Sequence, residues 1–380
     1  MQQFPKALLD KLQLRIDGNA LRQLPISKGL VDFSSNDYLC FSQSKEIFDG
    51  AHQYLLDKGY IKNGATGSRL ISGNHDVYKE TEDFITRFHK SEAALIFNSG
   101  YDANVGLFSS VPQKEDVVLY DEYIHASIRD GMRLSNAKAY KFKHNDLSHL
   151  ESLISRHKDD AGEIYIVTES VFSMDGDSPD LVQLIRLSEK HHCRLIVDEA
   201  HALGVFGNTG EGLLQQLGMQ DNVFARIMTF GKGLGCHGAA VLGSAQLKDY
   251  LVNFARSFIY TTALPPHSLA TIYTAYSHLK NNTSIKNRLI DNISFFTSKI
   301  DELSLSNYFI PSSSAIHCAV IPGNEKVKNI SSVLQQKDFD VKAILSPTVP
   351  EGQERLRFCI HSFNTRQEIQ SVLIELSQLL

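Results

Sequence analysis

The chain has 380 residues, a formal net charge of −5 at pH 7 and 42% hydrophobic residues. That length can bury a large core and a smaller second one, and the composition is typical of a folded globular protein, which excludes a disordered chain. The acidic balance excludes the broad basic surface that nucleic acids or anionic membranes require, so we expect neither as a partner.

Two further classes are excluded by the pattern of the chain. We find neither the apolar core of a signal peptide nor an apolar run that approaches a membrane span, so we expect a cytoplasmic protein. The five cysteines are scattered without a CxxC pair, which indicates free thiols rather than disulfides or structural zinc. His191, His192 and Cys193 are consecutive and point in different directions, so we expect no metal site.

In chain order, the sequence predicts three parts. Residues 1–40 form an N-terminal arm, in which Ala7, Leu8, Leu12 and Leu14 have helical spacing. Residues 41–265 alternate short apolar runs with amphipathic segments, which predicts a large α/β domain with a mostly parallel sheet of the seven-stranded type, flanked by helices. Residues 266–380 follow the break at Pro265-Pro266, begin with a long helical pattern over 267–303, and form a smaller α+β domain.

The expected strands of the large domain are short apolar runs, at 94–97, 117–120, 164–167, 195–197, 226–229 and 239–242. Polar, glycine or acidic residues follow most of them. Because ligands of open α/β sheets bind beyond the carboxyl ends of the strands, we expect the chemistry in those clusters.

The strand at 195–197 leads into Asp198-Glu199-Ala200-His201, which places a carboxylate and an imidazole three residues apart. One turn of chain can direct both at a single ligand. The alternative is that Asp198 caps a following helix.

The next strand leads into Gly231-Lys232-Gly233-Leu234-Gly235, a lysine in a glycine-rich turn. Glycines allow a bulky ligand to approach the backbone. A nucleophilic lysine needs a lowered pKa, which burial or a neighbouring cation can supply. The glycine-flanked lysine is by itself equally compatible with an ordinary turn.

An anion site is predicted where residues 98–104 follow a strand and open a helix, with Ser99, Gly100 and Tyr101 at the junction. Thr229 would add a hydroxyl from another strand end. An ordinary strand-to-helix turn is the alternative.

His125, Glu169 and Ser173 also follow strand ends. A single histidine is more often structural than catalytic, but an acid, a lysine, two imidazoles and an anion site converge on one rim of the predicted sheet. We therefore interpret this rim as an active site.

Two other motif interpretations are disfavoured, the first by its spacing and the second by a missing acidic residue. Asp198 to His201 spells a DEAH box of nucleic-acid-dependent ATPases, but a P-loop ending at Lys232 would need glycine at Arg226 and a hydroxyl at Gly233. Gly233, Gly235 and Gly238 match the dinucleotide fingerprint GxGxxG, yet the acidic residue that should end the next strand is missing.

Motifs along nearly the whole chain resemble the α-oxoamine synthases, a family of fold-type-I enzymes that depend on pyridoxal 5′-phosphate (PLP). The matching segments are 32–39, 97–104, 171–177, 197–204, 229–242, 259–266 and 355–357. The resemblance implies the PLP-dependent transferase fold and the decarboxylative condensation of an amino acid with an acyl thioester, carried by coenzyme A or a carrier protein. It also implies a homodimer with shared active sites.

The resemblance assigns roles to matching positions. Lys232 would form the Schiff base, Asp198 would bond the ring nitrogen, and His125 would stack on the ring. His201 and Ser173 would address the phenolic oxygen, with Glu169 among the cofactor-binding residues. The phosphate would be surrounded by Ser99, Gly100, Tyr101 and Thr229, with Thr261 or Thr262 from the partner subunit. Arg357, Arg22 and Asn36 would bind substrate.

Within the family, residues 34–39, 144–146 and 230–232 are most similar to the members that join L-alanine to a pimeloyl thioester in biotin synthesis. Members that use glycine or serine, with acetyl, succinyl or palmitoyl thioesters, are the alternatives. Three positions depart from the family pattern: Cys40 replaces a glycine, and Cys236-His237 replace a small pair. These departures bear on how the acyl chain would be bound, and so on which thioester is used.

Overall fold

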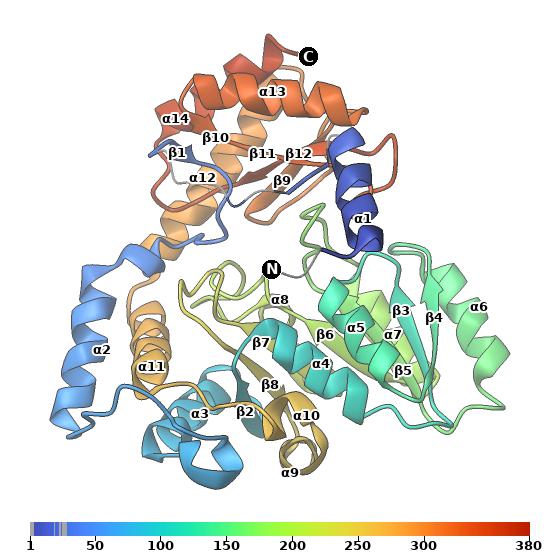
Figure 1. Cartoon of the computed structure of the whole chain (residues 1–380), viewed down its shortest axis with the longest axis vertical. Coiled ribbons are helices and arrows are strands. Elements are labelled where there is room, and N and C mark those ends of the chain that lie inside the picture. Colours follow the sequence, from blue (N-terminus) through green and yellow to red (C-terminus); the bar gives the residue numbers. More distant parts are fainter. Residues whose placement is uncertain (1–3, 19, 23, 25–28) are drawn as a thin grey trace.

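A computed structural model describes residues 4–18, 20–22, 24 and 29–380. Figure 1 shows a larger lobe built around a wide sheet and a smaller lobe above it that contains the C-terminus. None of the described helices combines the length and the apolar character that crossing a membrane requires.

The larger lobe is organised around one central sheet. Its strands are β2 (Ala93–Phe97), β3 (Val117–Asp121), β4 (Lys138–Phe142), β5 (Ile164–Glu169), β6 (Arg194–Asp198), β7 (Ala225–Thr229) and β8 (Ala239–Gly243). They lie in the order β2-β8-β7-β6-β5-β3-β4, and all neighbours are parallel except for β8, which runs antiparallel to β2 and β7. The six predicted strands and the mostly parallel sheet are thereby confirmed.

Helices cover both faces of this sheet. The helices of the larger lobe are α2 (Lys45–Asp57), α3 (Asp76–Phe88), α4 (Gly100–Ser110), α5 (Ala126–Leu134), α6 (Leu147–His157), α7 (Leu181–Lys190), α8 (Leu213–Gln216), α9 (Ala245–Phe254), α10 (Arg256–Ile259) and α11 (Pro266–Asn281). Of these, α2 packs against α11. Short helical turns occur at Phe41–Gln43, Arg69–Gly73 and Gln220–Asn222.

Alternate residues of the strands point to opposite faces and join different cores. Val118 of β3 packs with α4, α5, α9 and α10, whereas its neighbours Val117 and Leu119 pack with α6, α7 and α8. At the other end of the sheet, Ile96 of β2 packs with α3 and α11. Burial on both faces explains why most of these strands are nearly continuous apolar runs.

The smaller lobe contains β9 (Ile316–Val320), β10 (Phe339–Asp340), β11 (Lys342–Ile344), β12 (Arg355–Cys359), α12 (Thr283–Glu302), α13 (Asn324–Gln336) and α14 (Arg366–Ser377). Its main sheet is antiparallel in the order β11-β12-β9. The short strand β1 (Val31–Asp32) pairs with β10 in parallel, and the Phe33 ring lies 6.2 Å from that of Phe339. The chain around residue 33 thus packs on the smaller lobe, while the three domain boundaries stay predictions.

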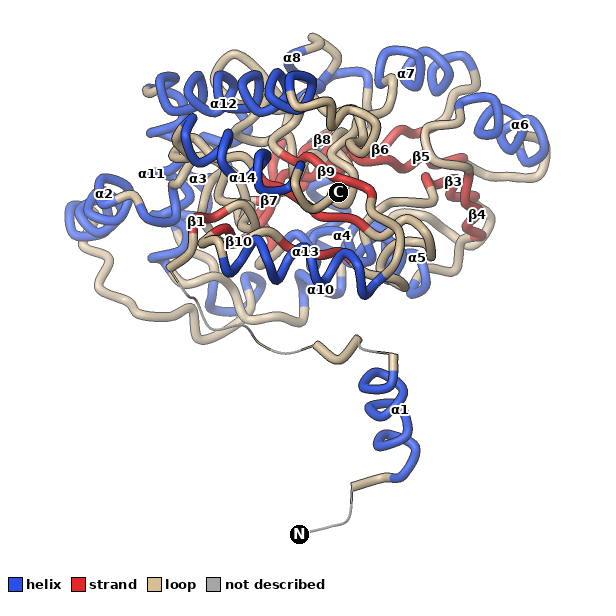
Figure 2. Tube along the Cα trace, turned by 90° about the horizontal axis from the view of Figure 1, so that it is seen from above, coloured by secondary structure: helices blue, strands red, loops and turns tan. Residues whose placement is uncertain are grey.

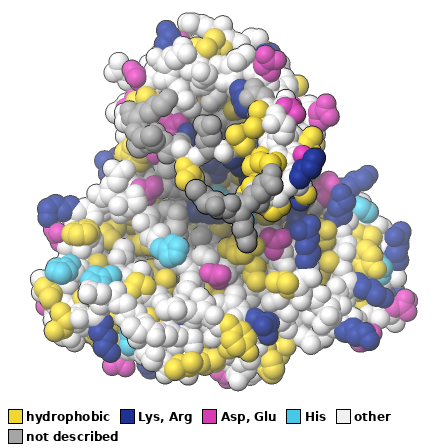
Figure 3. Space-filling model, in the orientation of Figure 1, with side chains coloured by type: hydrophobic (Ala, Val, Ile, Leu, Met, Phe, Trp, Pro, Cys, Tyr) yellow, Lys and Arg dark blue, Asp and Glu magenta, His cyan; other side chains and the backbone are white. Residues whose placement is uncertain are grey.

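The expected N-terminal helix is present as α1 (Lys6–Asp17). None of its residues is buried, and Leu8, Leu9, Leu12, Leu14 and Ile16 are all exposed. Seen from above, α1 extends away from the body of the molecule (Figure 2), and apolar side chains are visible at the surface around its position (Figure 3).

Two elements differ from the sequence prediction. Strand β4 was missed because only Phe142 of its five residues is buried, so this edge strand has no apolar run. The helical pattern over 267–303 is two helices, because the Asn282 side chain accepts a hydrogen bond from the Ser284 backbone and starts α12 as its N-cap.

Candidate active site

Four strands of the central sheet end at one edge and bring the predicted side chains together. Glu169 ends β5, Asp198 ends β6, Thr229 ends β7, and His125 follows β3. These strands are parallel neighbours, so their carboxyl ends meet. The smaller lobe closes on the same edge, since Arg357 of β12 donates from Nε to the backbone oxygen of Ser173 at 2.7 Å.

Lys232 is half-buried in the turn between β7 and β8, and its Nζ lies 2.8 Å from Nε2 of His201. Burial lowers the pKa of the Lys232 amine, while the carboxylates of Asp198 and Glu169 oppose that change. A lowered pKa enlarges the fraction of neutral amine, which is the nucleophilic form.

The glycines around Lys232 are only partly explained by room for a ligand. A Cβ at Gly233 would lie 2.3 Å from the Leu203 carbonyl oxygen, and one at Gly235, whose φ is +58°, would lie 2.1 Å from the Ser42 nitrogen. Glycine is therefore needed at these two positions because the chain's own backbone lies too close for a Cβ. Gly231 has open space beside it, since a Cβ there would meet its nearest atom at 3.4 Å.

His201 is buried and has a partner on each ring nitrogen. Its Nδ1 lies 2.6 Å from the hydroxyl of Tyr38, whose oxygen is 3.2 Å from Oδ1 of Asn36. Asn36 Oδ1 also accepts from Nη2 of Arg357 at 3.0 Å. A continuous path of polar contacts thus joins Lys232 to Arg357. Burial and the neighbouring Lys232 hold the pKa of His201 well below its ordinary value, so the ring is neutral.

Asp198 is buried and fixed at both carboxylate oxygens. Oδ1 accepts from the Ala200 backbone at 2.9 Å, and Oδ2 accepts from Nδ2 of Asn104 on α4 at 3.0 Å. The chain turns after β6 without starting a helix, so the interpretation of Asp198 as a helix cap is wrong.

His125 is held by the first turn of α5. Its Nδ1 accepts from the Ser127 backbone at 3.2 Å and lies 2.7 Å from Ser127 Oγ. Because Nδ1 accepts, the proton of the neutral ring lies on Nε2. Burial and the nearby Lys232 lower the pKa of His125. Asn104 donates to Ser127 Oγ at 3.0 Å as well as to Asp198. One amide therefore positions both Asp198 and the serine hydroxyl that contacts His125.

Glu169 is buried between these groups, and its Oε1 accepts from the His125 backbone at 2.6 Å. Burial and the adjacent carboxylate of Asp198 raise the pKa of Glu169 to about 8. Glu169 therefore carries a proton over much of the neutral range, which avoids two adjacent negative charges.

The predicted anion site lies at the start of α4. Ser99 is its N-cap, with Oγ accepting from the Asp102 backbone at 3.0 Å. A Cβ on Gly100 would lie 2.5 Å from Oγ1 of Thr229, so the helix start and the end of β7 are in close approach. Tyr101 is exposed and donates to Asp130 at 2.8 Å. Exposed backbone N–H groups beside a hydroxyl suit a phosphate, and the assigned phosphate contacts stay predictions.

The other predicted site residues, Thr261, Thr262, Arg22 and Ser173, lie at or beyond the margin of the group of side chains around Lys232. Asn98 donates from Nδ2 to Thr261 Oγ1 at 3.1 Å and to the Thr262 backbone at 2.7 Å, within the same chain. Arg22 is exposed on the arm and has no side-chain hydrogen bond or ion pair to another described residue. Its role, and that of the buried Ser173 side chain, stay predictions.

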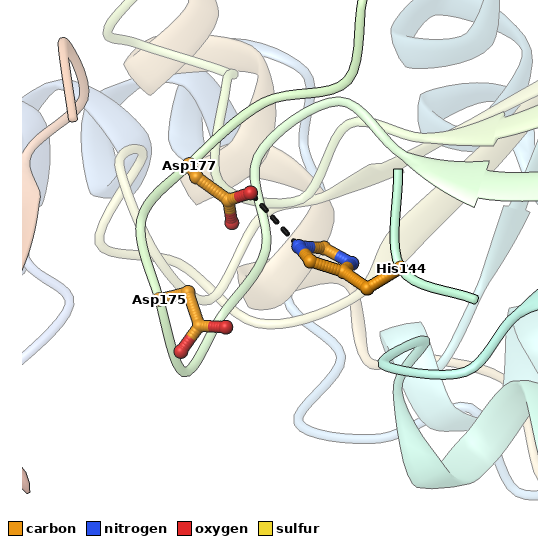
Figure 4. A group of neighbouring side chains, drawn as sticks. All are labelled: His144, Asp175 and Asp177. Carbon is orange, nitrogen blue, oxygen red and sulfur yellow. Dashed lines mark hydrogen bonds and ion pairs between the residues drawn. The ribbon is translucent and has the colours of Figure 1, made fainter. Parts of the chain in front are cut away.

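A second charged cluster lies beyond β3 and β5, and Figure 4 shows three of its residues, His144, Asp175 and Asp177. His144 Nδ1 lies 2.9 Å from Asp121 Oδ1, and Nε2 lies 2.8 Å from Asp177 Oδ2. Burial opposes the charge, but the two carboxylates raise the pKa of His144 to about 9. A protonated ring has no lone pair for a metal, and Asp175 is paired with Arg355. The arrangement is that of an ion-pair network.

The three departures from the family pattern have different surroundings. Cys40 has a φ of +62°, the left-handed conformation that favours glycine. Cys236 donates to the Leu234 carbonyl at 3.0 Å, and burial raises the pKa of its thiol. His237 is exposed. All five cysteines are free.

Sequence reasoning missed three residues of the site: Tyr38, Asn104 and Ser127. Asn104 offered a signal, since it is a polar residue on the apolar face of α4 next to Ala103 and Leu107. Tyr38 and Ser127 each stand two residues from a predicted site residue, but only the fold reveals what their hydroxyls contact.

Known proteins resemble the chain over nearly its whole length. The family model of class I and II aminotransferases matches residues 28–375. An 8-amino-7-oxononanoate synthase of Emericella nidulans is 39% identical over 400 residues, covering 98% of this chain and 96% of the relative.

Two solved structures extend the comparison. An 8-amino-7-oxononanoate synthase of Francisella tularensis has a TM-score of 0.79 at 31% identity, covering 93% of this chain and 98% of that one. A serine palmitoyltransferase of S. paucimobilis with PLP and myriocin bound has a TM-score of 0.88 at 24% identity, covering 98% and 96%.

Proposed function

Since the chain belongs to the class I and II aminotransferase family and, within it, to the α-oxoamine synthases, we propose that it condenses L-alanine with a pimeloyl thioester. The products are 8-amino-7-oxononanoate, carbon dioxide and the free thiol, in biotin biosynthesis. The observation that carries this proposal is the 39% identity to a relative of that name over 98% of the chain.

The cofactor is PLP, and the residues at the sheet edge fit it. Lys232 is the amine that would hold PLP covalently. Asp198, fixed through Asn104, would pair with the ring nitrogen, and His125 would lie on the ring face. The close approach of Gly100 to Thr229 leaves small groups where the phosphate would bind. When bound, PLP supplies an electron sink for the substrate's Cα.

The chain's own groups supply binding and proton transfer. Arg357 would bind the amino-acid carboxylate, because its guanidinium lies on the smaller lobe and is oriented by Asn36 and by the Ser173 carbonyl. Lys232 would remove and return the Cα proton, since a lowered pKa suits a general base near neutral pH. Arg22 on the arm is the candidate for a carboxylate of the acyl substrate.

The alternative substrates are those of related synthases: glycine with an acetyl or succinyl thioester, or serine with palmitoyl. The support for the serine type is a likeness of fold at 24% identity. Alanine and pimeloyl thioester are favoured because two relatives of that type match at 39% and 31% identity.

Covalent attachment of PLP is tested by borohydride reduction of the loaded protein followed by peptide mapping. We expect the label on Lys232 and loss of the visible absorbance. Lys232→Ala should carry no label, while Lys45→Ala, which removes an exposed lysine, should be labelled as in the unaltered protein. A label on another residue would contradict the proposal.

Substrate choice is tested by titrating alanine, glycine and serine into the loaded protein and following its visible spectrum. Each amino acid is then incubated with pimeloyl-coenzyme A and with pimeloyl carrier protein, and the products are identified by mass spectrometry. We expect 8-amino-7-oxononanoate from alanine. A preference for glycine or serine would assign the chain to another synthase of the family.

A homodimer with shared sites is part of this proposal. Apolar side chains on several segments of the larger lobe are mostly exposed in the single chain, among them Phe48, Ile61, Ile71 and Tyr260. Contiguous exposed apolar surface is unfavourable in water and marks interaction surfaces. Tyr260 adjoins Thr261, so a partner that covers Tyr260 would receive the neighbouring threonines at its site.

A further inference from the structure

Tyr38 is fully buried and lies between His201 and Arg357. Its hydroxyl is 2.6 Å from Nδ1 of His201 and 3.2 Å from Oδ1 of Asn36. Burial raises the pKa of the Tyr38 phenol, so it keeps its proton. One O–H group thus faces two acceptors and can serve only one of them at a time.

The orientation of Asn36 is fixed by its other contact. Arg357 can only donate, and its Nη2 lies 3.0 Å from Oδ1 of Asn36, so this oxygen faces Tyr38 as an acceptor. His201 is neutral and carries one proton, on either Nδ1 or Nε2. Its Nε2 is 2.8 Å from Nζ of Lys232.

Two proton arrangements give each ring nitrogen of His201 a hydrogen bond, one with Tyr38 and one with Lys232. In the first, Tyr38 donates to His201 Nδ1, the ring proton is on Nε2, and it is donated to a neutral Lys232 amine. In the second, Tyr38 donates to Asn36, His201 Nδ1–H donates to the Tyr38 oxygen, and Nε2 accepts from a Lys232 ammonium. Each arrangement goes with one charge state of Lys232.

We propose that Tyr38 is a positioning residue that sets the tautomer of His201 and, through it, the protonation of Lys232. The inference rests on the proposed function in that Lys232 is the amine that holds PLP. The shorter contact, from Tyr38 to His201, favours the first arrangement, in which Lys232 is the neutral nucleophile.

Other charged and titratable groups also act on Lys232. Asp198 and Glu169 favour its charged form, whereas Arg357 and burial disfavour it, and His125 and Cys359 lie within electrostatic reach. Of these groups, Arg357 also interacts with the Tyr38 hydroxyl, so Tyr38→Phe removes that contact as well, whereas the Asp198 and Glu169 carboxyl groups keep their hydrogen bonds. That substitution leaves His201 Nδ1 without a partner in both arrangements. Because an unpaired buried N–H is less tolerated than an unpaired acceptor, the second arrangement, with the ammonium, is disfavoured relative to the first.

The test compares Tyr38→Phe with Tyr276→Phe, a matched control. Tyr276 is also fully buried, and its hydroxyl lies 2.9 Å from Nε2 of another buried histidine, His89. The first measurement is the rate at which the cofactor-free protein attaches PLP as a function of pH. For Tyr38→Phe we expect the midpoint to move down by about 0.5 to 1 pH unit, which is about three- to tenfold more neutral amine at a fixed pH.

The second measurement needs no cofactor. In ¹⁵N-histidine-labelled protein, with the His201 signals assigned through His201→Gln, we expect Tyr38→Phe to move both His201 nitrogen signals and Tyr276→Phe to leave them unchanged. If no variant attaches PLP, the proposed function fails, and these signals still decide the role of Tyr38. Unmoved His201 signals in Tyr38→Phe would overturn the inference.

A third variant covers the case in which Tyr38→Phe does not fold. Asn36→Leu removes the acceptor of the second arrangement, so Tyr38 should donate to His201 permanently. We then expect His201 to show a proton on Nε2 across the pH range in which the unaltered protein changes tautomer. The same tautomer change in both proteins would overturn the inference.

Discussion

Glu169 and Asp198 lie opposite each other in the register of β5 and β6, so two buried carboxyl groups share the sheet edge next to Lys232. The pKa of Glu169 is raised from 4.5 to about 8 by burial and by Asp198. Unfolding exposes this carboxyl to water, where it ionises at its ordinary pKa. Between these two values the folded state therefore binds more protons than the unfolded state.

This relationship predicts that the contribution of Glu169 to the stability of the cofactor-free protein is lost as the pH rises from about 5 to 8. A group whose pKa is raised by folding contributes stability that is complete below its unfolded pKa and is lost as pH passes through its folded pKa. One group changes the free energy of unfolding by at most about 1.4 kcal/mol per pH unit. The measurement is chemical denaturation at a series of pH values.

The control is Glu169→Gln, which keeps the shape and cannot ionise. We expect the stability of this variant, relative to that of the unaltered protein, to increase as the pH rises over the same range, because the loss due to Glu169 is absent. Glu163→Gln alters a partly exposed acid that precedes β5, at the end of the strand opposite Glu169, and should leave the pH dependence unchanged. Equal slopes for Glu169→Gln and the unaltered protein would contradict the assignment of a raised pKa to Glu169.

Gly100→Ala should weaken PLP binding without unfolding the protein. A Cβ at this position would lie 2.5 Å from Thr229 Oγ1, so the hydroxyl has to move away from the expected phosphate. Loss of one hydrogen bond to a charged group costs about 1.5–3 kcal/mol, or roughly ten- to a hundredfold in affinity. Equilibrium dialysis of PLP measures the change.

Two comparisons make this prediction specific to the phosphate. Gly64→Ala adds a Cβ where no atom lies within 4 Å, and PLP affinity should not change. Pyridoxal, which lacks the phosphate, should bind Gly100→Ala and the unaltered protein equally. A similar loss for pyridoxal would mean that Gly100 supports the ring and not the phosphate.

Cys40→Gly should stabilise the protein. Cys40 has a φ of +62° and a ψ of 27°, a left-handed conformation that costs a residue with a Cβ about 1–2 kcal/mol. Glycine avoids this cost but gains freedom in the unfolded chain, so we expect a net gain of about 0.5–1 kcal/mol in the free energy of unfolding. Denaturant titration measures it.

Cys40→Ala is the control, because it removes the thiol and keeps the Cβ. It should leave stability nearly unchanged or slightly lower. Equal gains from Cys40→Gly and Cys40→Ala would assign the effect to the thiol instead of the backbone.

Most of the fold and the rim residues could be predicted from the sequence because both leave local signals. The buried strands are apolar runs, and Asp198, Glu169 and Thr229 stand where those runs end. Edge strand β4 left no such signal, since four of its five residues are exposed and only Phe142 is buried.

The support of the site could not be predicted, since it is made by contacts between distant segments. Tyr38 meets His201 across 163 positions, and Asn104 meets Asp198 across 94. Likewise, two of the three glycines around Lys232 are required by Leu203 and Ser42, which only the folded chain brings close. Sequence position identifies which residues carry the reactive side chains, whereas the hydrogen bonds that orient those side chains depend on tertiary structure.

Mixed dimers test whether Thr261 and Thr262 act at the partner's site. The partners are Lys232→Ala and the double variant Thr261→Ala with Thr262→Ala, each of which should be nearly inactive as a homodimer. If the threonines act across the interface, one site of the mixed dimer carries both lesions and the other carries none. We then expect about half of the unaltered activity, measured as product formed by differently tagged chains purified in tandem.

A mixed dimer of Lys232→Ala with Asp198→Ala is the matched control. Lys232 and Asp198 lie on one rim of the same chain, so each site of that dimer keeps one lesion, and it should stay inactive. Inactivity of the threonine mixed dimer as well would place Thr261 and Thr262 at the site of their own chain, where Asn98 already contacts them. Full activity of the double threonine variant as a homodimer would remove both residues from the site.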